Sequence, residues 1–115
     1  MTTIAENTGV TTLINVFTVE PSNQQKLVDI LARATETSVR DVPGFISAAL
    51  HRSVDGTKVT MYSQWKSAQH YQQYQAMQSN PAASPYVEQA LAIAKFEPGM
   101  YEVVKVFAGS SPPTH

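Results

Sequence analysis

From residue 13 onward, side chains alternate between two faces of the chain. One face carries Leu13, Asn15, Phe17 and Val19, and the other carries Ile14, Val16 and Thr18. A period of two among β-branched and aromatic residues is typical of a strand. The pattern therefore predicts a strand at residues 13–19 that holds Asn15 in an apolar row.

A helical repeat follows this strand. Ser22 and Gln25 have the spacing of a capping box, in which each side chain bonds a free backbone N–H group. The apolar residues after it recur every three or four positions, at Leu27, Ile30, Leu31 and Ala34. This stripe predicts a helix that runs to about Arg40.

The middle of the chain has the pattern of a β-hairpin. Pro43-Gly44 interrupts the helix, and two stretches typical of strands follow at residues 45–52 and 57–65. Asp55-Gly56 lies between them, and glycine tolerates the positive φ of a tight turn. We therefore expect these two stretches to pair as antiparallel strands.

Strict alternation along the hairpin sorts its side chains. On the second strand, one face carries Val59, Met61, Ser63 and Trp65. On the first strand, His51 is expected to share a face with Phe45, Ser47 and Ala49.

The rest of the chain predicts two further helices and a last strand. Ser67 is the expected N-cap of a short helix that carries Tyr71, Tyr74 and Met77. Ser84-Pro85 predicts another helix start, because proline is tolerated at the first helical position. The buried stripe of that helix would consist of Val87, Ala90, Leu91 and Ala94. Pro98-Gly99 ends it, and residues 100–107 are expected to form the final strand.

The order β-α-β-β-α-β predicts an α+β fold, namely the ferredoxin-like split βαβ arrangement with an antiparallel sheet. We expect one such domain at residues 11–108, preceded by a flexible segment at 1–10 and followed by a flexible tail at 109–115. Helices in this fold cover only one sheet face. The expected outer face carries too many apolar residues for open water, at Ile14, Val16, Ile46, Leu50 and Tyr62, with Thr18 beside them. We therefore expect a homodimer that buries this uncovered face.

Composition and charge narrow the possible partners. The chain of 115 residues has a formal net charge of −1 and no cluster of basic residues, which argues against nucleic acid and anionic membranes as partners. No apolar run is long enough to span a bilayer, and no secretion signal is recognisable. With no cysteine and only scattered histidines, the sequence predicts neither a disulfide nor a metal site and fits the cytoplasm.

Three motifs resemble the antibiotic biosynthesis monooxygenase family. They are Asn15-Val16-Phe17-Thr18-Val19, Pro43-Gly44-Phe45 and Trp65-Lys66-Ser67. The resemblance covers about residues 11 to 107. It implies a dimeric α+β barrel with a ligand cavity between sheet and helices in each subunit. In well-known members, aromatic polyketide anthrones are oxidised to quinones with O₂ and without metal, flavin or haem.

Residues 47–56 and 62–71 are similar to the polyketide anthrone oxygenase-like branch of that family. This resemblance implies that His51, Trp65 and Tyr71 line or serve the cavity, and that Asn15 corresponds to a β-strand asparagine implicated in catalysis. The chain departs from the branch at one position: Met61 stands where an asparagine is usual, four residues before the tryptophan.

The resemblance and the residue chemistry together predict a cofactor-independent monooxygenase with O₂ as co-substrate, acting on a hydroxylated aromatic of the anthrone or quinol type. Asn15 and Trp65 could donate hydrogen bonds where negative charge develops, and His51 or Tyr71 could transfer a proton. The expected pocket wall consists of Phe17, Met61, Tyr74 and Leu91.

Other interpretations fit some of the same residues. Trp65 is also typical of a core anchor, and His51 of a solvated strand end. The whole domain could be a non-catalytic ligand-binding or regulatory dimer, or an isomerase or dehalogenase on the same scaffold. In the haem-degrading branch of the superfamily, the matching positions are Asn15, Tyr74 and Ser84, and the last of these lacks the iron-binding histidine.

Overall fold

The computed structural model describes residues 4, 9–78 and 85–109. The predicted flexible segments at 1–10 and 109–115 fall mostly outside this range, and so does Ser84. The described strands form one antiparallel sheet in the order β2-β3-β1-β4. Strand β1 (Thr11–Val19) is central and pairs with β3 (Lys58–Trp65). Strand β2 (Phe45–Arg52) flanks β3.

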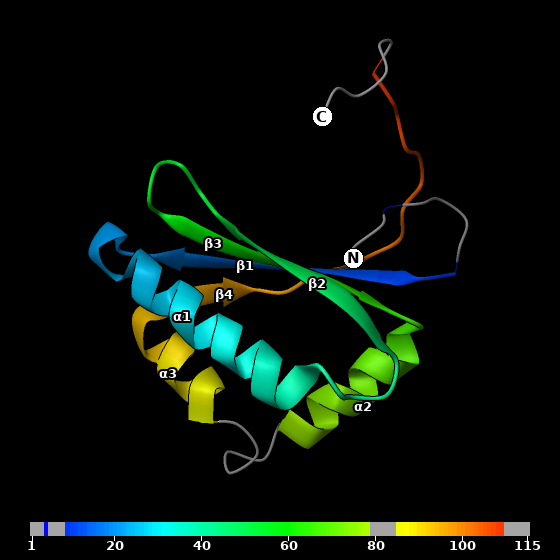
Figure 1. Ribbon diagram of the computed structural model, residues 1–115, viewed down its shortest axis with the longest axis horizontal. Coiled ribbons are helices and arrows are strands. Elements are labelled where there is room, and N and C mark those ends of the chain that lie inside the picture. Colours follow the sequence, from blue (N-terminus) through cyan, green and yellow to red (C-terminus); the bar gives the residue numbers. More distant parts are fainter. Residues whose placement is uncertain (1–3, 5–8, 79–84, 110–115) are drawn as a thin grey trace.

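The helices connect these strands along one side of the sheet, as Figure 1 shows. Helix α1 (Gln24–Ala34) links β1 to β2. Helices α2 (Ala68–Gln78) and α3 (Pro85–Ile93) follow β3 along the chain and precede the last strands. The predicted α+β, ferredoxin-like fold is confirmed, and its second crossover is built from two helices.

The predicted capping box at the start of the first helix is wrong. A 3₁₀ turn, η1 (Pro21–Asn23), precedes α1, and neither cap makes a side-chain hydrogen bond. The Gln25 side chain donates instead to Asp29 and accepts from Arg52. The helix then continues as a π-helical turn, η2 (Thr35–Val39), which follows α1 directly.

The predicted start signals of the later helices are correct where they can be seen. The backbone N–H of His70 donates to Ser67 Oγ over 3.2 Å, which is the N-cap bond of α2. Helix α3 begins at Pro85, where the missing N–H group leaves no intrahelical bond unmade.

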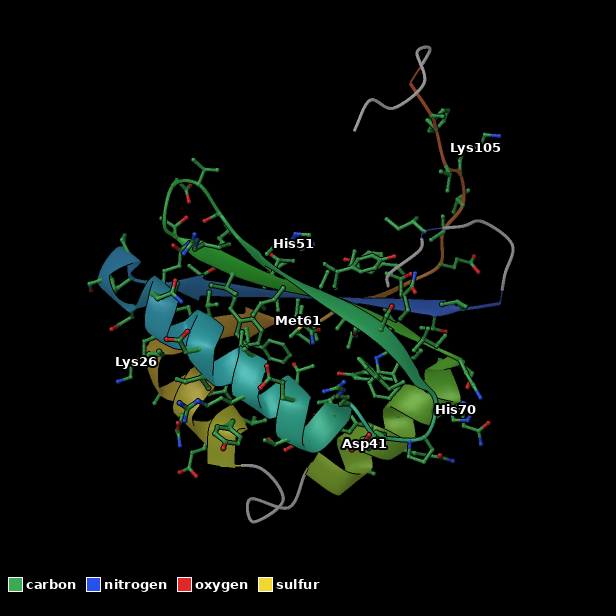
Figure 2. The ribbon with its side chains drawn as sticks, viewed as in Figure 1. Lys26, Asp41, His51, Met61, His70 and Lys105 are labelled. Carbon is green, nitrogen blue, oxygen red and sulfur yellow. The ribbon has the colours of Figure 1, made fainter. Side chains whose placement is uncertain are left out.

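A β-bulge in β2 overturns the expected face of His51. Phe45 pairs with Trp65, but Ser47 pairs with Gln64, so Ile46 is an extra residue without a partner. Because side chains alternate, the extra residue exchanges the faces of everything after it. His51 therefore lies opposite Thr60 on the uncovered side, whereas Leu50 lies opposite Met61 on the helix side. Figure 2 shows His51 and Met61 on opposite sides of the sheet.

The C-terminal strand was predicted too late in the chain. Strand β4 (Ala94–Glu97) starts directly after α3, and β5 (Met100–Tyr101) follows a short break. Ala94, expected in a helical stripe, pairs with Val19 of β1. The open edge of β1 supplies backbone partners here, and this pairing overrides the local helical pattern. Residues 102–109 form no strand and extend away from the sheet (Figure 1).

Two apolar clusters fill the space between sheet and helices. The larger one centres on Phe17, Leu27 and Val59, with Leu50 and Met61 packed against it. The smaller one consists of Leu13, Trp65 and Tyr71, with Phe45 and Tyr74 at its border. The candidate site lies where these two clusters meet.

Candidate active site

A cavity of about 310 Å³ lies between the inner sheet face and the helices. This is within the range of small-ligand sites, although near its lower end. The sequence candidates that line it are Asn15, Phe17, Met61, Trp65, Tyr71, Tyr74 and Leu91. His51 is absent from the lining because the bulge turns it to the other face, where it is exposed.

One end of the cavity is aromatic. The Trp65 ring stacks on Tyr74 with a centroid distance of 5.4 Å, and its edge contacts involve Tyr71 at 5.3 Å and Phe45 at 5.4 Å. Trp65 is only 1% exposed. Such packing holds the indole in one orientation, so its N–H group has a fixed direction.

The indole N–H of Trp65 is already engaged. It donates to Ser63 Oγ over 3.2 Å, and both residues are buried on the cavity side of β3. Indole has a single N–H donor. The N–H group of Trp65 is thus bonded to the Ser63 hydroxyl, and both residues line the cavity. Sequence reasoning placed Ser63 on this face but did not select it, although its position between Met61 and Trp65 was the available signal.

Asn15 presents an unpartnered oxygen. Its Oδ1 atom is buried and accepts no hydrogen bond, and the residue lines the cavity. In the β1–β3 register Asn15 lies directly opposite Met61, whose thioether has no N–H or O–H group to offer. A buried carbonyl oxygen without a donor costs about 1–3 kcal/mol. This position is therefore suited to a ligand that brings its own donor.

Tyr74 keeps its proton over the whole neutral range. Burial raises its pKa from 10.0 to about 12, and the nearby Tyr71 adds to the effect. The Tyr74 hydroxyl is thus a neutral donor beside the Trp65 ring rather than a base.

Helix residues close the other side of the cavity. The π-helical turn contributes Thr35 and Val39 to the wall, and Thr35 Oγ1 donates to the backbone oxygen of Leu31 over 2.9 Å. Leu91 and Val87 of α3 line the cavity while remaining 51% and 40% exposed, so they form its rim.

Phe96 of β4 also lines the cavity, and its ring stacks on Phe17 with a centroid distance of 4.9 Å. Sequence reasoning missed Phe96 because it placed the last strand too late.

None of the described residues that line the cavity carries a charge. Its residues are apolar, aromatic, amide or hydroxyl types, with no acid, base or thiol among them. Across the part of the chain that the structure describes, no three His, Cys, Asp or Glu side chains gather as a metal site would require. The described residues therefore offer neither a metal-binding set nor a cationic partner for a cofactor phosphate at this cavity. None of the described helices combines the length and hydropathy needed to cross a bilayer.

Comparison with known proteins agrees with this architecture. Residues 11–89 match the family model described as antibiotic biosynthesis monooxygenase. Tetracenomycin-F1 monooxygenase of Streptomyces glaucescens is 37% identical over 112 residues, which is 97% of each chain.

Solved structures of similar fold include two from Streptomyces. The monooxygenase from the gene ActVA-Orf6 of Streptomyces coelicolor, in complex with nanaomycin D, superposes with a TM-score of 0.72 at 28% identity, covering 87% of this chain and 92% of that one. SnoaB of Streptomyces nogalater, a cofactor-independent oxygenase, gives a TM-score of 0.70 at 21% identity, covering 87% and 98%. On the family match and the tetracenomycin relative, this chain belongs to the antibiotic biosynthesis monooxygenase family.

Proposed function

We propose that this protein is a cofactor-independent monooxygenase that oxidises a hydroxylated aromatic of the anthrone or quinol type with O₂. The observation that carries the proposal is the uncharged aromatic cavity, with its polar groups restricted to a few amide and hydroxyl side chains. The 37% identity to tetracenomycin-F1 monooxygenase over nearly the whole chain supports the same chemistry.

The proposed reaction needs only substrate and O₂. A substrate carbanion or enolate transfers electrons to O₂, and a C–O bond forms to give a hydroperoxide. Loss of water then leaves a new carbonyl, so one oxygen atom enters the product and the other leaves as water. The carbon loses two electrons when the C–O bond forms and two more when water is lost. These four electrons reduce O₂ to the carbonyl oxygen and water, so no external reductant is consumed.

The cavity residues favour this chemistry by solvation and positioning. Aromatic walls admit O₂ and exclude water around an electron-rich substrate. Asn15 and the Trp65–Ser63 pair supply polar contacts, and Tyr71 and Tyr74 lie beside them at the aromatic end. We assign His51 no role in proton transfer within this cavity, because it lies on the opposite sheet face.

A substrate that ionises by itself suits this site. No carboxylate or imidazole lines the cavity among the described residues, so a side-chain base is missing where the substrate proton would leave. Anthrones and quinols with acidic protons can supply the anion without such a base.

Oxygen uptake tests the proposal directly. Protein treated with chelator is supplied with a panel of anthrones and hydroquinones, and wild type is compared with Asn15→Ala and Trp65→Phe. We expect enzyme-dependent uptake that falls about tenfold in each variant, equivalent to about 1.4 kcal/mol of transition-state stabilisation. Binding of aromatics without any uptake would instead favour a non-catalytic ligand-binding protein.

We also propose a homodimer formed through the uncovered sheet face. Ile14, Val16 and Tyr62 of that face are only partly buried in the single chain, and Ile46 is 44% exposed. Covering such apolar area by a second copy would be favourable. A monomeric mass in light scattering at micromolar concentration would contradict the dimer. The cysteine-free composition fits a reducing compartment, and we propose the cytoplasm as its location.

A further inference from the structure

The Ser63 hydroxyl accepts one hydrogen bond and donates none within the described part of the chain. It accepts the Trp65 indole N–H over 3.2 Å and is 4% exposed at the cavity floor. A serine hydroxyl has one donor and two acceptor sites. No hydrogen bond found in the described part of the chain uses the Ser63 proton. Ser63 can therefore accept from Trp65 and donate into the cavity at the same time.

Asn15, on the neighbouring strand, offers a hydrogen-bond acceptor on the same face as Ser63. Asn15 pairs with Met61, and Ser63 lies two residues further along β3 on the same face. Such diagonal neighbours in an antiparallel pair are roughly 7–8 Å apart. The buried Oδ1 atom of Asn15 has no donor. On this strand pair the cavity floor thus presents the Ser63 hydroxyl as a donor and the Asn15 carbonyl oxygen as an acceptor.

We propose that Ser63 and Asn15 form a recognition pair for a ligand edge that carries both a carbonyl oxygen and a hydroxyl group. Ser63 donates to the carbonyl oxygen, or to the enolate oxygen formed from it, and Asn15 Oδ1 accepts from the hydroxyl. Trp65 is a positioning residue that acts through Ser63. This inference rests on the proposed function, since it specifies the substrate class of the same cavity.

The surroundings of the pair make it selective. The described residues that line the cavity are uncharged, so none of them can replace a missing hydrogen bond with an ionic contact. A ligand without the hydroxyl leaves Asn15 Oδ1 buried and unpaired, and sites built on such polar groups reject ligands that lack the matching group. A ligand without the carbonyl leaves the Ser63 proton unused. Affinity should therefore be highest for a molecule that carries both groups.

Three aromatic probes separate the two contacts. They are 2-hydroxyanthraquinone, which has both groups, 2-methoxyanthraquinone, which lacks the donor, and 2-hydroxyanthracene, which lacks the carbonyl. Dissociation constants are measured by equilibrium dialysis, without turnover, in mildly acidic buffer that keeps the hydroxyl protonated. We expect wild type to bind the first probe about tenfold more tightly than either of the others.

Each variant should abolish one preference and keep the other. Asn15→Leu should bind the hydroxy and methoxy quinones equally, and Ser63→Ala should weaken both quinones while leaving 2-hydroxyanthracene unaffected. Ser63→Thr, which retains a hydroxyl, should restore binding of the quinones. If Ser63→Ala weakens all three probes equally, Ser63 is structural and the proposal is wrong.

The role of Trp65 needs a double variant. Trp65→Phe should reproduce the Ser63→Ala pattern in weaker form, and it should have no further effect on the quinone preference in the Ser63→Ala background. An equal loss in both backgrounds would show that Trp65 contacts the ligand directly. Probe preferences without oxygen uptake would contradict the proposed function alone. Oxygen uptake with flat preferences would overturn the recognition pair alone.

Discussion

Asn15 of β1 and Met61 of β3 lie directly opposite each other in the antiparallel pair, and both line the cavity. Met61 occupies the position where similar sequences were expected to carry an asparagine. The structure shows that an amide is still present at this level of the sheet, but on the neighbouring strand. The Met61 thioether has no donor for the Asn15 Oδ1 atom, so this buried oxygen remains without a hydrogen bond.

Replacing the Asn15 amide should raise the stability of the fold and lower its affinity for ligands. We expect Asn15→Leu to raise the free energy of unfolding by about 1 kcal/mol, because a buried unpaired oxygen is removed. The same variant should bind hydroxylated aromatics more weakly. Urea unfolding and equilibrium dialysis measure the two effects.

Thr12→Val is the matched control. Thr12 Oγ1 is likewise buried without a partner, but Thr12 neighbours Gln64 and lies outside the cavity lining. Its replacement should alter stability without changing ligand affinity. A loss of affinity in both variants would indicate a general disturbance of the sheet.

Gly44 should tolerate no side chain. It has φ +90°, and a Cβ atom built there would lie 2.4 Å from the His70 side chain, which packs over the start of β2. Gly44→Ala should therefore lose the roughly 1–2 kcal/mol expected from the left-handed backbone and more from the clash. Gly9→Ala is the control, because Gly9 has φ +77° but nothing within 4 Å. Thermal unfolding should show a clearly larger loss at Gly44.

The pH dependence of activity should follow the substrate. The pKa of Tyr74 is raised to about 12, and no carboxylate or imidazole is found among the described residues that line the cavity. We expect kcat/KM to rise once with pH, at a value that changes when the acidity of the substrate changes. Tyr74→Phe should leave that midpoint in place. A midpoint that stays constant across substrates would instead reveal an enzymatic base.

The turn at Asp55 should make part of the stability sensitive to acid. Hydrogen bonds from Thr57, through its hydroxyl at 2.7 Å and its backbone N–H at 3.0 Å, and from Ser53 lower the pKa of Asp55 from 3.8 to about 2. Because the pKa of Asp55 is lower in the folded than in the unfolded state, its ionised form stabilises the fold at pH values above the unfolded-state pKa. This contribution is lost as pH falls from about 4 towards 2. Asp55→Asn should thus lower the urea midpoint at neutral pH. The difference from wild type should shrink steadily as pH falls from about 4 towards 2, and a constant difference would contradict this reasoning.

Alternation and turn signals in the sequence were enough to place the hairpin, the central strand and the N-cap at Ser67. These features depend on residues close in sequence, such as Asp55-Gly56 at the turn and Leu13 to Val19 on the strand. The same alternation put Asn15, Met61 and Trp65 on one layer, which is where the structure has them. The capping box failed because Gln25 found a partner in Arg52, on a distant strand.

The sequence by itself determined the α+β order of elements and the apolar rows that face the helices, because both follow from local periodicity. Only the tertiary structure decided which polar groups meet in the cavity. The extra residue Ile46 turns His51 outward, and the edge of β1 draws Ala94 into a strand. The fixed indole of Trp65 selects Ser63 as its acceptor. Each of these depends on pairing between segments far apart in the chain, which no local pattern records.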